Sequence, residues 1–456
     1  MGTHRPPSGT GGGKVTEDRL ALDRRHMLGL GAAAIATVAS GRVSAASKPA
    51  KPFLWGAATA GHQVEGNNVN ADIWLLEQVD PTVFAEPSGD ACDSLHRWRE
   101  DVAIVKALGL NAYRFSVEWS RIEPAPGQFS QAYLDHYARI VDRCREQGLA
   151  PVVTFNHFTT PRWFAAAGGW ENSDAPDLFA RYCDKVARAM AAGMSHALTF
   201  NEPNLALGGR WSASPPPPAF MDRIAACVAA AAKASGSDRF SLLNTGDPAP
   251  MIPGVTAAHV KGREAIRAAR GDLPIGLSLA IPDNVAVVEN SAIERKRADV
   301  YGPFFAVMDK DDFVGVQTYG RAYVGAERDV EIPADVPRRP GGGEWYPAAV
   351  GNVVRYAHEA TGLPVMVTEN GIDAADDAER ERFIPEAIAS VEAARKDGVP
   401  VLGYIHWSLL DNFEWFSGYG PKFGLVAVDR QTFKRTVKPS AKRLGAIARA
   451  GGTGAR

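Results

Sequence analysis

The sequence is poor in cysteine, has no excess of either charge and contains no apolar run long enough to cross a bilayer. Its 456 residues include four cysteines, and 50 Lys and Arg residues against 52 Asp and Glu residues give a net charge of −2. Surfaces that bind nucleic acid need a basic excess, so we expect no nucleic-acid partner. A spanning helix needs about 20 apolar residues, so we expect no integral membrane segment in the mature protein.

The chain also lacks the short motifs of several metal and cofactor sites. Its cysteines form no C-x-x-C pair, which argues against a zinc or redox site. No glycine-rich phosphate loop follows the first predicted strand, and no nucleophile elbow of a serine hydrolase is found. We therefore expect neither a metal nor a cofactor.

The N-terminal segment has the features of an export leader. Residues 1–14 are rich in Gly, Pro and Ser, which predicts disorder. The pair Arg24-Arg25, the short apolar stretch 27–41 and the small residues at 43–46 resemble a twin-arginine signal. The alternative is a buried Ala/Gly helix. An exported protein would be periplasmic or secreted. One that folds before export would keep its thiols free, and a disulfide bond is the alternative.

Short β-branched or aromatic runs alternate with longer amphipathic stretches through the rest of the chain. Two such helical patterns are 97–108 and 132–147, and Gly109, Gly148 and Gly398 are expected to end helices. The predicted strands are Phe53–Ala60, Ala112–Ser116, Pro151–Phe155, Ala197–Asn201, Ile275–Leu279, Phe313–Gln317, Val365–Thr368 and Val401–Trp407.

Eight strand–helix units predict an α/β protein built as a single (β/α)8 TIM barrel, with its active site at the C-terminal ends of the strands. The alternative is an open doubly wound sheet, which the missing phosphate loop disfavours. Length alone would suggest about three domains. We instead predict a disordered N-terminus with signal peptide, one catalytic domain and a short tail, at 1–46, 47–449 and 450–456.

The longest interval between predicted strands, 202–274, contains the proline run Ser214–Pro218. We interpret this run as a rigid surface loop. The alternative is a wall of the site entrance, since long barrel insertions tend to lie on the active-site face.

Two glutamates, Glu202 and Glu369, each stand beside an Asn where a predicted strand ends. Amide side chains and several tryptophans follow other strand ends. Glycoside hydrolysis needs one carboxylic acid at the leaving oxygen and a carboxylate near the anomeric carbon. A lone glutamate is more often a surface charge, but two at strand ends of one barrel predict this chemistry.

The chain from Phe53 to Leu444 resembles glycoside hydrolase family 1, the β-glucosidase family. The matching stretches keep the family's order and lie at 53–60, 63–66, 111–116, 199–203, 368–371 and 406–415. The resemblance implies that Glu202 is the general acid/base and Glu369 the nucleophile. It further implies that the other site residues orient the nucleophile (Arg114, Tyr319) or bind and stack on the sugar (Gln63, His157, Asn201, Trp407, Glu414, Trp415).

Electrostatics leads to the same division of roles. A guanidinium beside Glu369 favours its charged form, while burial and a negative neighbour should raise the pKa of Glu202. Such a pair predicts retention of configuration and a carboxylate separation of about 5–5.5 Å.

The departures from the family concern the pocket wall. Gln317-Thr318-Tyr319 and Asn156-His157-Phe158 differ from the usual residues, and 204–219 has little family character. Glu414 argues for an unphosphorylated sugar. We predict an exo-acting retaining β-glycosidase, with β-glucosidase favoured, that binds a small-molecule β-glycoside; the oligomeric state stays open. The alternatives are a sugar-binding pseudoenzyme or sensor, and a transglycosylase that shares the first step. An endo-acting polysaccharidase is disfavoured.

Overall fold

The computed structural model describes residues 52–454, except 244, 340 and 341. From Pro52 onwards the chain forms one compact unit. The predicted signal peptide and N-terminus, 1–46, lie outside the described residues.

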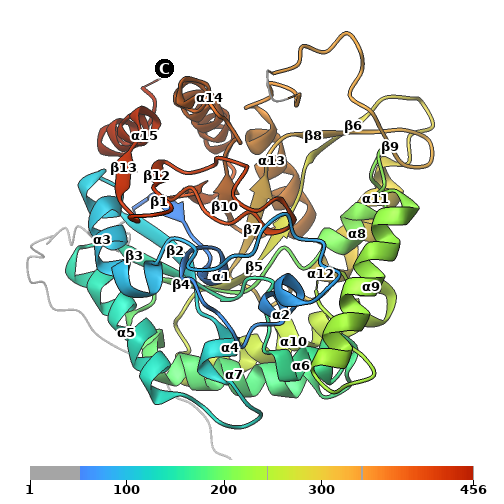
Figure 1. The fold of residues 1–456 in the computed structure, drawn as a ribbon. Helices are drawn as coiled ribbons and strands as arrows, with labels where there is room; N and C mark the ends of the chain where they lie inside the picture. Colours follow the sequence, from blue (N-terminus) through green and yellow to red (C-terminus); the bar gives the residue numbers. More distant parts are fainter. Residues whose placement is uncertain (1–51, 244, 340–341, 455–456) are drawn as a thin grey trace, which may run out of the picture. The chain divides into compact units, whose positions relative to one another are not determined.

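Eight parallel strands close into a barrel, in the order β1-β11-β10-β7-β5-β4-β3-β2, and helices surround them (Figure 1). The single barrel is thereby confirmed, and the open doubly wound alternative is wrong. Each barrel strand coincides with a predicted one: β1 (Leu54–Ala58), β2 (Ala112–Ser116), β3 (Ala150–Asn156), β4 (His196–Asn201), β5 (Ile275–Ala280), β7 (Phe313–Thr318), β10 (Val365–Asn370) and β11 (Val401–Trp407).

The longer helices alternate with these strands. They are α3 (Ser94–Ala107), α5 (Gln131–Glu146), α7 (Ala175–Met190), α10 (Pro248–Ala269), α11 (Ile293–Val300), α13 (Ala349–Thr361), α14 (Asp377–Lys396) and α15 (Pro439–Ala450). The 17-residue helix α9 (Pro218–Ala234) lies in the connection after β4. Short helices in the connections are α1 (Gly61–Val64), α2 (Asp72–Gln78), α4 (Trp119–Ile122), α6 (Arg162–Ala166), α8 (Leu205–Gly209) and α12 (Gly302–Phe305). Short strands outside the barrel are β6 (Asp283–Ala286), β8 (Arg321–Val324), β9 (Asp329–Val330), β12 (Val426–Val428) and β13 (Arg435–Val437), and single 3-10 turns are η1 (Gly169–Glu171), η2 (Ala191–Gly193) and η3 (Trp415–Ser417).

Helix α5 shows why these segments fold as predicted. Its buried face carries Leu134, Tyr137 and Val141 at helical spacing. Its N-cap, Ser130, accepts a hydrogen bond from the Tyr133 amide. The helix ends before Gly148, which takes a φ of +70°, and this left-handed conformation suits glycine.

The interior of the barrel is filled by side chains and is not a channel. Leu54, Ala112, Val152, Leu198 and Phe313 form part of one buried apolar cluster there. Arg114 follows Ala112 by two residues on a regular strand, so it points to the same interior.

Strands β4 and β10 depart from regular pairing close to the two glutamates. The β4–β5 register shifts between Leu198 and Asn201, and the β10–β7 register shifts between Val367 and Glu369. After the shift in β4, Thr199 bonds to His259 of α10, while Asn201 reaches Arg114 inside the barrel. Such irregularities re-aim side chains next to active sites.

All four cysteines are buried and free, so the described chain contains no disulfide. Three of them, Cys144, Cys183 and Cys227, lie on helices α5, α7 and α9.

Candidate active site

A cavity of about 990 Å³ opens at the C-terminal ends of the barrel strands. Nine of the ten predicted site residues line it: Gln63, His157, Asn201, Glu202, Tyr319, Glu369, Trp407, Glu414 and Trp415. The tenth, Arg114, is buried and contacts the cavity-lining residues Glu369 and Asn201. The structure thus brings together residues that are up to 352 positions apart, as the difference 415 − 63 shows.

Glu369, at the end of β10, is held from both sides. Arg114 Nη1 donates to its Oε1 at 2.6 Å, and the Tyr319 hydroxyl donates to its Oε2 at 2.6 Å. Arg114 Nη2 donates to Asn201 Oδ1 at 2.5 Å, which links the carboxylate to the end of β4. Two charge-assisted hydrogen bonds fix this carboxylate in one orientation.

Glu202 directly follows β4 and turns toward the same cavity. Its backbone takes a φ of +45°, and its amide donates to the Ser278 carbonyl of β5 at 2.9 Å. A non-glycine residue in this left-handed region is uncommon, and such conformations cluster at active sites. The turn places a second carboxyl group in the cavity that Glu369 lines.

The surroundings separate the two carboxyl groups in pKa. Burial and then the negative charge of Glu369 raise the pKa of Glu202 well above its ordinary value. Burial also raises the pKa of Glu369, but Arg114 and the Tyr319 hydrogen bond oppose that rise. We predicted that Arg114 would favour the ionised form of Glu369; its contribution has that sign, although burial outweighs it. Glu202 is therefore the carboxyl group that keeps its proton to higher pH and can donate it, and Glu369 is the one that ionises first.

The floor of the cavity carries polar atoms whose hydrogen-bonding capacity is unused within the described chain. Gln63 donates to Asn412 Oδ1 at 2.9 Å and to the Phe413 carbonyl at 2.8 Å, which fixes its amide. Its Oε1, together with Asn201 Nδ2 and His157 Nδ1, has no partner within the described chain. Buried polar atoms are costly without a partner, so these positions favour a hydroxyl-rich ligand.

Aromatic rings and one further carboxyl complete the floor. The His157 ring stacks on Trp407, with centroids 5.6 Å apart and planes at 16°. Burial and the charge of Arg114 lower the pKa of His157 well below its ordinary value, so its ring is neutral. Trp407 Nε1 donates to Glu414 Oε1 at 3.4 Å, and burial raises the pKa of Glu414 to about 8.

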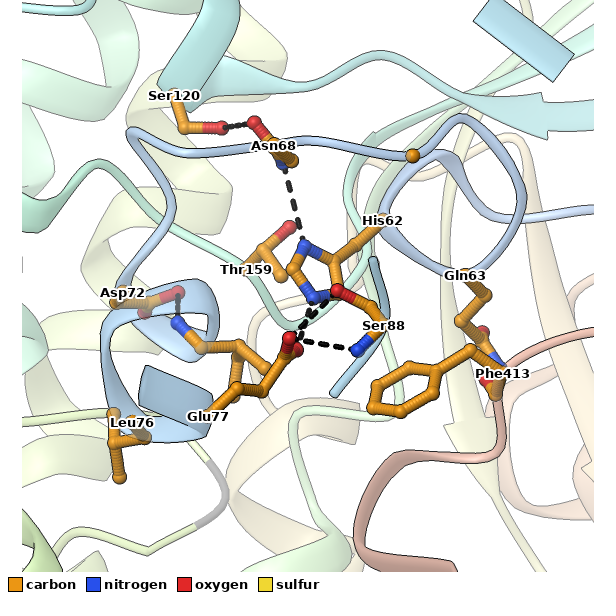
Figure 2. A network of polar contacts seen from close by, with 12 residues as sticks. His62, Gln63, Asn68, Asp72, Leu76, Glu77, Ser88, Ser120, Thr159 and Phe413 are labelled. Carbon is orange, nitrogen blue, oxygen red and sulfur yellow. Dashed lines mark hydrogen bonds and ion pairs between the residues drawn. The ribbon is translucent and has the colours of Figure 1, made fainter. Parts of the chain in front are cut away.

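A buried polar network around His62 lies next to the floor residue Gln63 (Figure 2). His62 Nε2 and Glu77 Oε1 are 2.8 Å apart, and the Ser88 amide and hydroxyl both donate to Glu77 Oε2. The His62 ring also stacks on the cavity residue Trp415, at 5.8 Å and 5°. Since Gln63 is the next residue along the chain, the network positions two cavity-lining side chains, Gln63 and Trp415.

The outer part of the cavity differs from the floor because its wall is apolar. Pro215 and Pro216 line it and are exposed, so the proline run is the surface loop that we predicted and also forms part of the cavity wall, as the alternative had it. Helix α9 adds Phe220, Met221 and Ile224. The run leads directly into α9, which begins at Pro218. Proline favours helical dihedrals in the first turn of a helix, so the loop and α9 form one continuous wall.

Sequence reasoning missed two groups of residues. The apolar lining of α9 repeats at helical spacing after the proline run, and that pattern could have indicated it. The network of His62 and Glu77 gave no comparable signal, because its members are scattered among unrelated motifs. Gln317, which departs from the family pattern, donates to Asn201 Oδ1 at 2.7 Å and so supports the floor.

The described residues lack the features of two other kinds of site. In residues 52–454 without the gaps, no cluster of three or more His, Cys, Asp or Glu side chains could hold a metal. No helix of that part is both long and apolar enough to cross a membrane.

Comparison with known proteins gives one consistent result. The model of glycosyl hydrolase family 1 matches residues 46–240 and 321–453. β-Glucosidase A of Thermotoga maritima is 32% identical over 424 residues, which is 85% of this chain and 95% of that protein. The β-glucosidase of an Agrobacterium species is 32% identical over 447 residues, covering 87% and 94%. The apo structure of a β-glucosidase designated 1317 superposes with a TM-score of 0.85 at 45% identity, covering 88% and 99%. The chain therefore belongs to glycosyl hydrolase family 1, and it is a glycoside hydrolase.

Proposed function

We propose that the protein is an exo-acting retaining β-glucosidase that removes terminal β-D-glucosyl residues by double displacement. One observation carries the proposal: Glu369 is held by Arg114 and Tyr319 in a cavity that Glu202, with its raised pKa, also lines. One carboxyl group is thus prepared to attack and the other to donate a proton.

In the first step, a Glu369 oxygen attacks the anomeric carbon and forms an ester bond to it. The bond from that carbon to the leaving oxygen breaks, and this oxygen takes the proton of Glu202. Formation of the ester removes the charge of Glu369, which is a cause of the raised pKa of Glu202. Glu202 therefore becomes a stronger acid and is left as a carboxylate.

In the second step, the Glu202 carboxylate takes a proton from water as the water oxygen attacks the anomeric carbon. The ester bond breaks, and Glu369 regains its charge beside Arg114. Two inversions at one carbon return the β-configuration. Asn201, Gln63, His157, Glu414 and Trp415 bind the sugar hydroxyls in this proposal, and Trp407 supplies the stacking surface.

The test is the activity of two variants on a pair of glucosides. Glu369→Gly should abolish hydrolysis of both an aryl and an alkyl β-glucoside. Glu202→Ala should lose the alkyl glucoside but keep the first step on an activated aryl glucoside, because that leaving group needs no proton. Glu381→Ala, an exposed glutamate on α14, is the matched control. Full activity of both site variants would overturn the proposal.

The preference for glucose rests on the relatives, which are named β-glucosidases. Aryl β-glycosides that differ only in the sugar test it directly. The highest kcat/KM is expected for the glucoside, and a galactoside or fucoside that exceeds it would change the assignment.

We also propose that the protein is exported by the twin-arginine route to the periplasm or the medium. The motif Arg24-Arg25 and the apolar stretch after it support this, and four free, buried thiols fit a chain that folds before export. Replacing both arginines by lysine should retain the folded protein in the cytoplasm. Unchanged export of that variant would contradict the proposal.

A further inference from the structure

The geometry points to an apolar aglycone, of a fused-ring or long-chain alkyl kind, in place of a second sugar. This inference rests on the proposed function and names the substrate class of the same cavity. It concerns the outer part of the cavity, beyond the floor that binds the glucosyl unit.

The position of Glu202 decides where the leaving group lies. A general acid must reach the leaving oxygen, so the aglycone lies beside Glu202 and extends away from Glu369. The chain turns directly from Glu202 into α8, since the Leu205 amide donates to the Glu202 carbonyl at 3.2 Å. Helices α8 and α9 and the proline run between them therefore form the wall on this side.

Much of this wall offers apolar surface. Its side chains include Leu205, Pro215, Pro216, Phe220, Met221 and Ile224. Leu205 is 39% exposed and Met221 is 48% exposed, unusually open for large apolar residues on one wall. Contiguous apolar surface of this kind marks a binding site.

The charged groups on this side are already paired. Arg210 Nη2 and Asp247 Oδ1 are 2.7 Å apart, and the same Asp247 caps α10 through the Ala249 amide. Apart from this pair and the Thr245 hydroxyl, which has no partner in the described chain, the wall has few groups that could replace the hydrogen bonds to water that a sugar in this place would give up. An apolar aglycone gains free energy from leaving water there, so the wall favours the apolar class.

The wall is also fixed in place before a substrate arrives. Prolines precede α9, and Cys227 and Ala231 of α9 are buried in a cluster with Leu76 of α2. The Phe220 ring meets Phe416 edge to face, with centroids 6.5 Å apart and planes at 88°. A preformed wall reduces the entropy lost when a flexible or bulky aglycone binds.

The size of the cavity agrees with this class. Its volume of about 990 Å³ lies at the upper end of the roughly 300–1,000 Å³ of sites that hold drug-sized ligands. One glucosyl unit leaves most of that volume for the aglycone.

The test compares n-octyl β-glucoside, methyl β-glucoside and cellobiose as substrates of the mature protein. Both alkyl glucosides release an unactivated alcohol, so a difference between them reports binding of the chain. We expect kcat/KM for the octyl glucoside to exceed that for the methyl glucoside by at least about tenfold, and also to exceed that for cellobiose. Equal values for the alkyl glucosides, or a preference for cellobiose, would overturn the inference.

Two variants locate the effect. The double variant Met221→Gln, Ile224→Gln should lower the octyl-to-methyl ratio of kcat/KM about five- to tenfold. Val288→Gln changes another exposed apolar residue, one that does not line the cavity, and should leave the ratio unchanged. An unchanged ratio in a folded double variant would contradict the inference; if the double variant fails to fold, the wild-type comparison decides alone. Turnover of aryl β-glucosides without apolar preference overturns this inference only, whereas no turnover of any glucoside overturns the proposed function as well.

Discussion

The floor of the cavity and its mouth are built from different kinds of side chain. The mouth is the outer wall that α8, the proline run and α9 form. At the floor, Gln63, His157 and Asn201 are buried and keep polar atoms without partners in the described chain. At the mouth, Leu205 and Met221 expose apolar surface. The floor is suited to one ligand with hydroxyl groups in defined positions. The mouth has few fixed hydrogen-bonding groups, so the affinity of a ligand there should depend on the apolar area that it buries.

The supports of the two regions differ in the same way. The floor rests on charged pairs, such as Arg114 with Glu369 and His62 with Glu77. The mouth rests on apolar packing of α9 against α2 and on prolines. Removing one partner of a buried charged pair leaves the other charge uncompensated, which costs much free energy. Removing part of an apolar surface costs free energy in proportion to the area lost. Substitutions at the floor should therefore have larger effects than substitutions at the mouth.

Among the residues that support the two regions, the largest effect is expected at Arg114. Arg114→Met should lower kcat/KM by about 10³-fold, because it removes the positive group that orients and charges Glu369. It should also lower the free energy of unfolding by about 3–5 kcal/mol. Arg114 lowers the pKa of Glu369, so its loss raises that pKa and moves the acidic limb of the pH–rate profile to higher pH. Arg114→Lys keeps the charge and should shift this limb less. An unshifted limb in the Met variant would contradict the role of Arg114.

Glu414→Gln should lower kcat/KM about 10- to 100-fold, because it replaces a carboxyl group proposed to bind the sugar hydroxyls by an amide with a different pattern of donors and acceptors. It should also change how stability depends on pH. The pKa of Glu414 is raised to about 8 in the folded protein, against about 4.3 in an unfolded chain. Its contribution is complete below the lower value and is lost as the pH rises through about 8, by at most about 1.4 kcal/mol per pH unit. Thermal unfolding between pH 5 and 8 should show a shallower decline in the variant, and an identical slope would argue against this titration.

Glu77→Gln separates support of the floor from contact with substrate. It should lower stability by about 3 kcal/mol, since His62 loses its ionic partner. The kcat/KM should fall less than about tenfold, because Gln63 and Trp415 remain and only their positions loosen. Urea unfolding and glucoside kinetics measure the two effects. A selective loss of the octyl-to-methyl ratio would show that the network acts on the mouth instead.

The smallest effect is expected at Pro216. Pro216→Ala removes a constraint on the loop but little apolar surface, so the octyl-to-methyl ratio should fall by about two- to threefold at most. Steady-state kinetics on both alkyl glucosides measures it. A larger change than that of the double variant at Met221 and Ile224 would reverse the order of importance within the wall.

The barrel and the set of site residues could be predicted from the sequence because both rest on local patterns. Each barrel strand is a short β-branched or aromatic run, and each predicted site residue lies at or just after a strand end or in a family motif. The register shifts in β4 and β10 could not be predicted this way. Strict alternation from Leu198 would turn Asn201 away from the barrel interior, and only the three-dimensional pairing corrects this.

The network behind the floor and the apolar mouth were beyond prediction for another reason. Gln63 bonds to Asn412, which is 349 residues away, so no local pattern relates them. The proline run predicted an exposed loop, which the structure has, but carried no information on what that loop faces. Its place beside the cavity follows from α9 packing on α2, a contact between distant segments.

The central claim is that Glu369 forms a covalent bond to the sugar. A 2-deoxy-2-fluoro β-glucoside with an activated leaving group slows breakdown of the glycosyl-enzyme more than its formation, so the intermediate should accumulate. Mass spectrometry of the digested protein should then find one fluoroglucosyl group, on the peptide that contains Glu369, and none in Glu369→Gly. A label on another residue, or an enzyme that turns over glucosides and takes no label, would contradict the account.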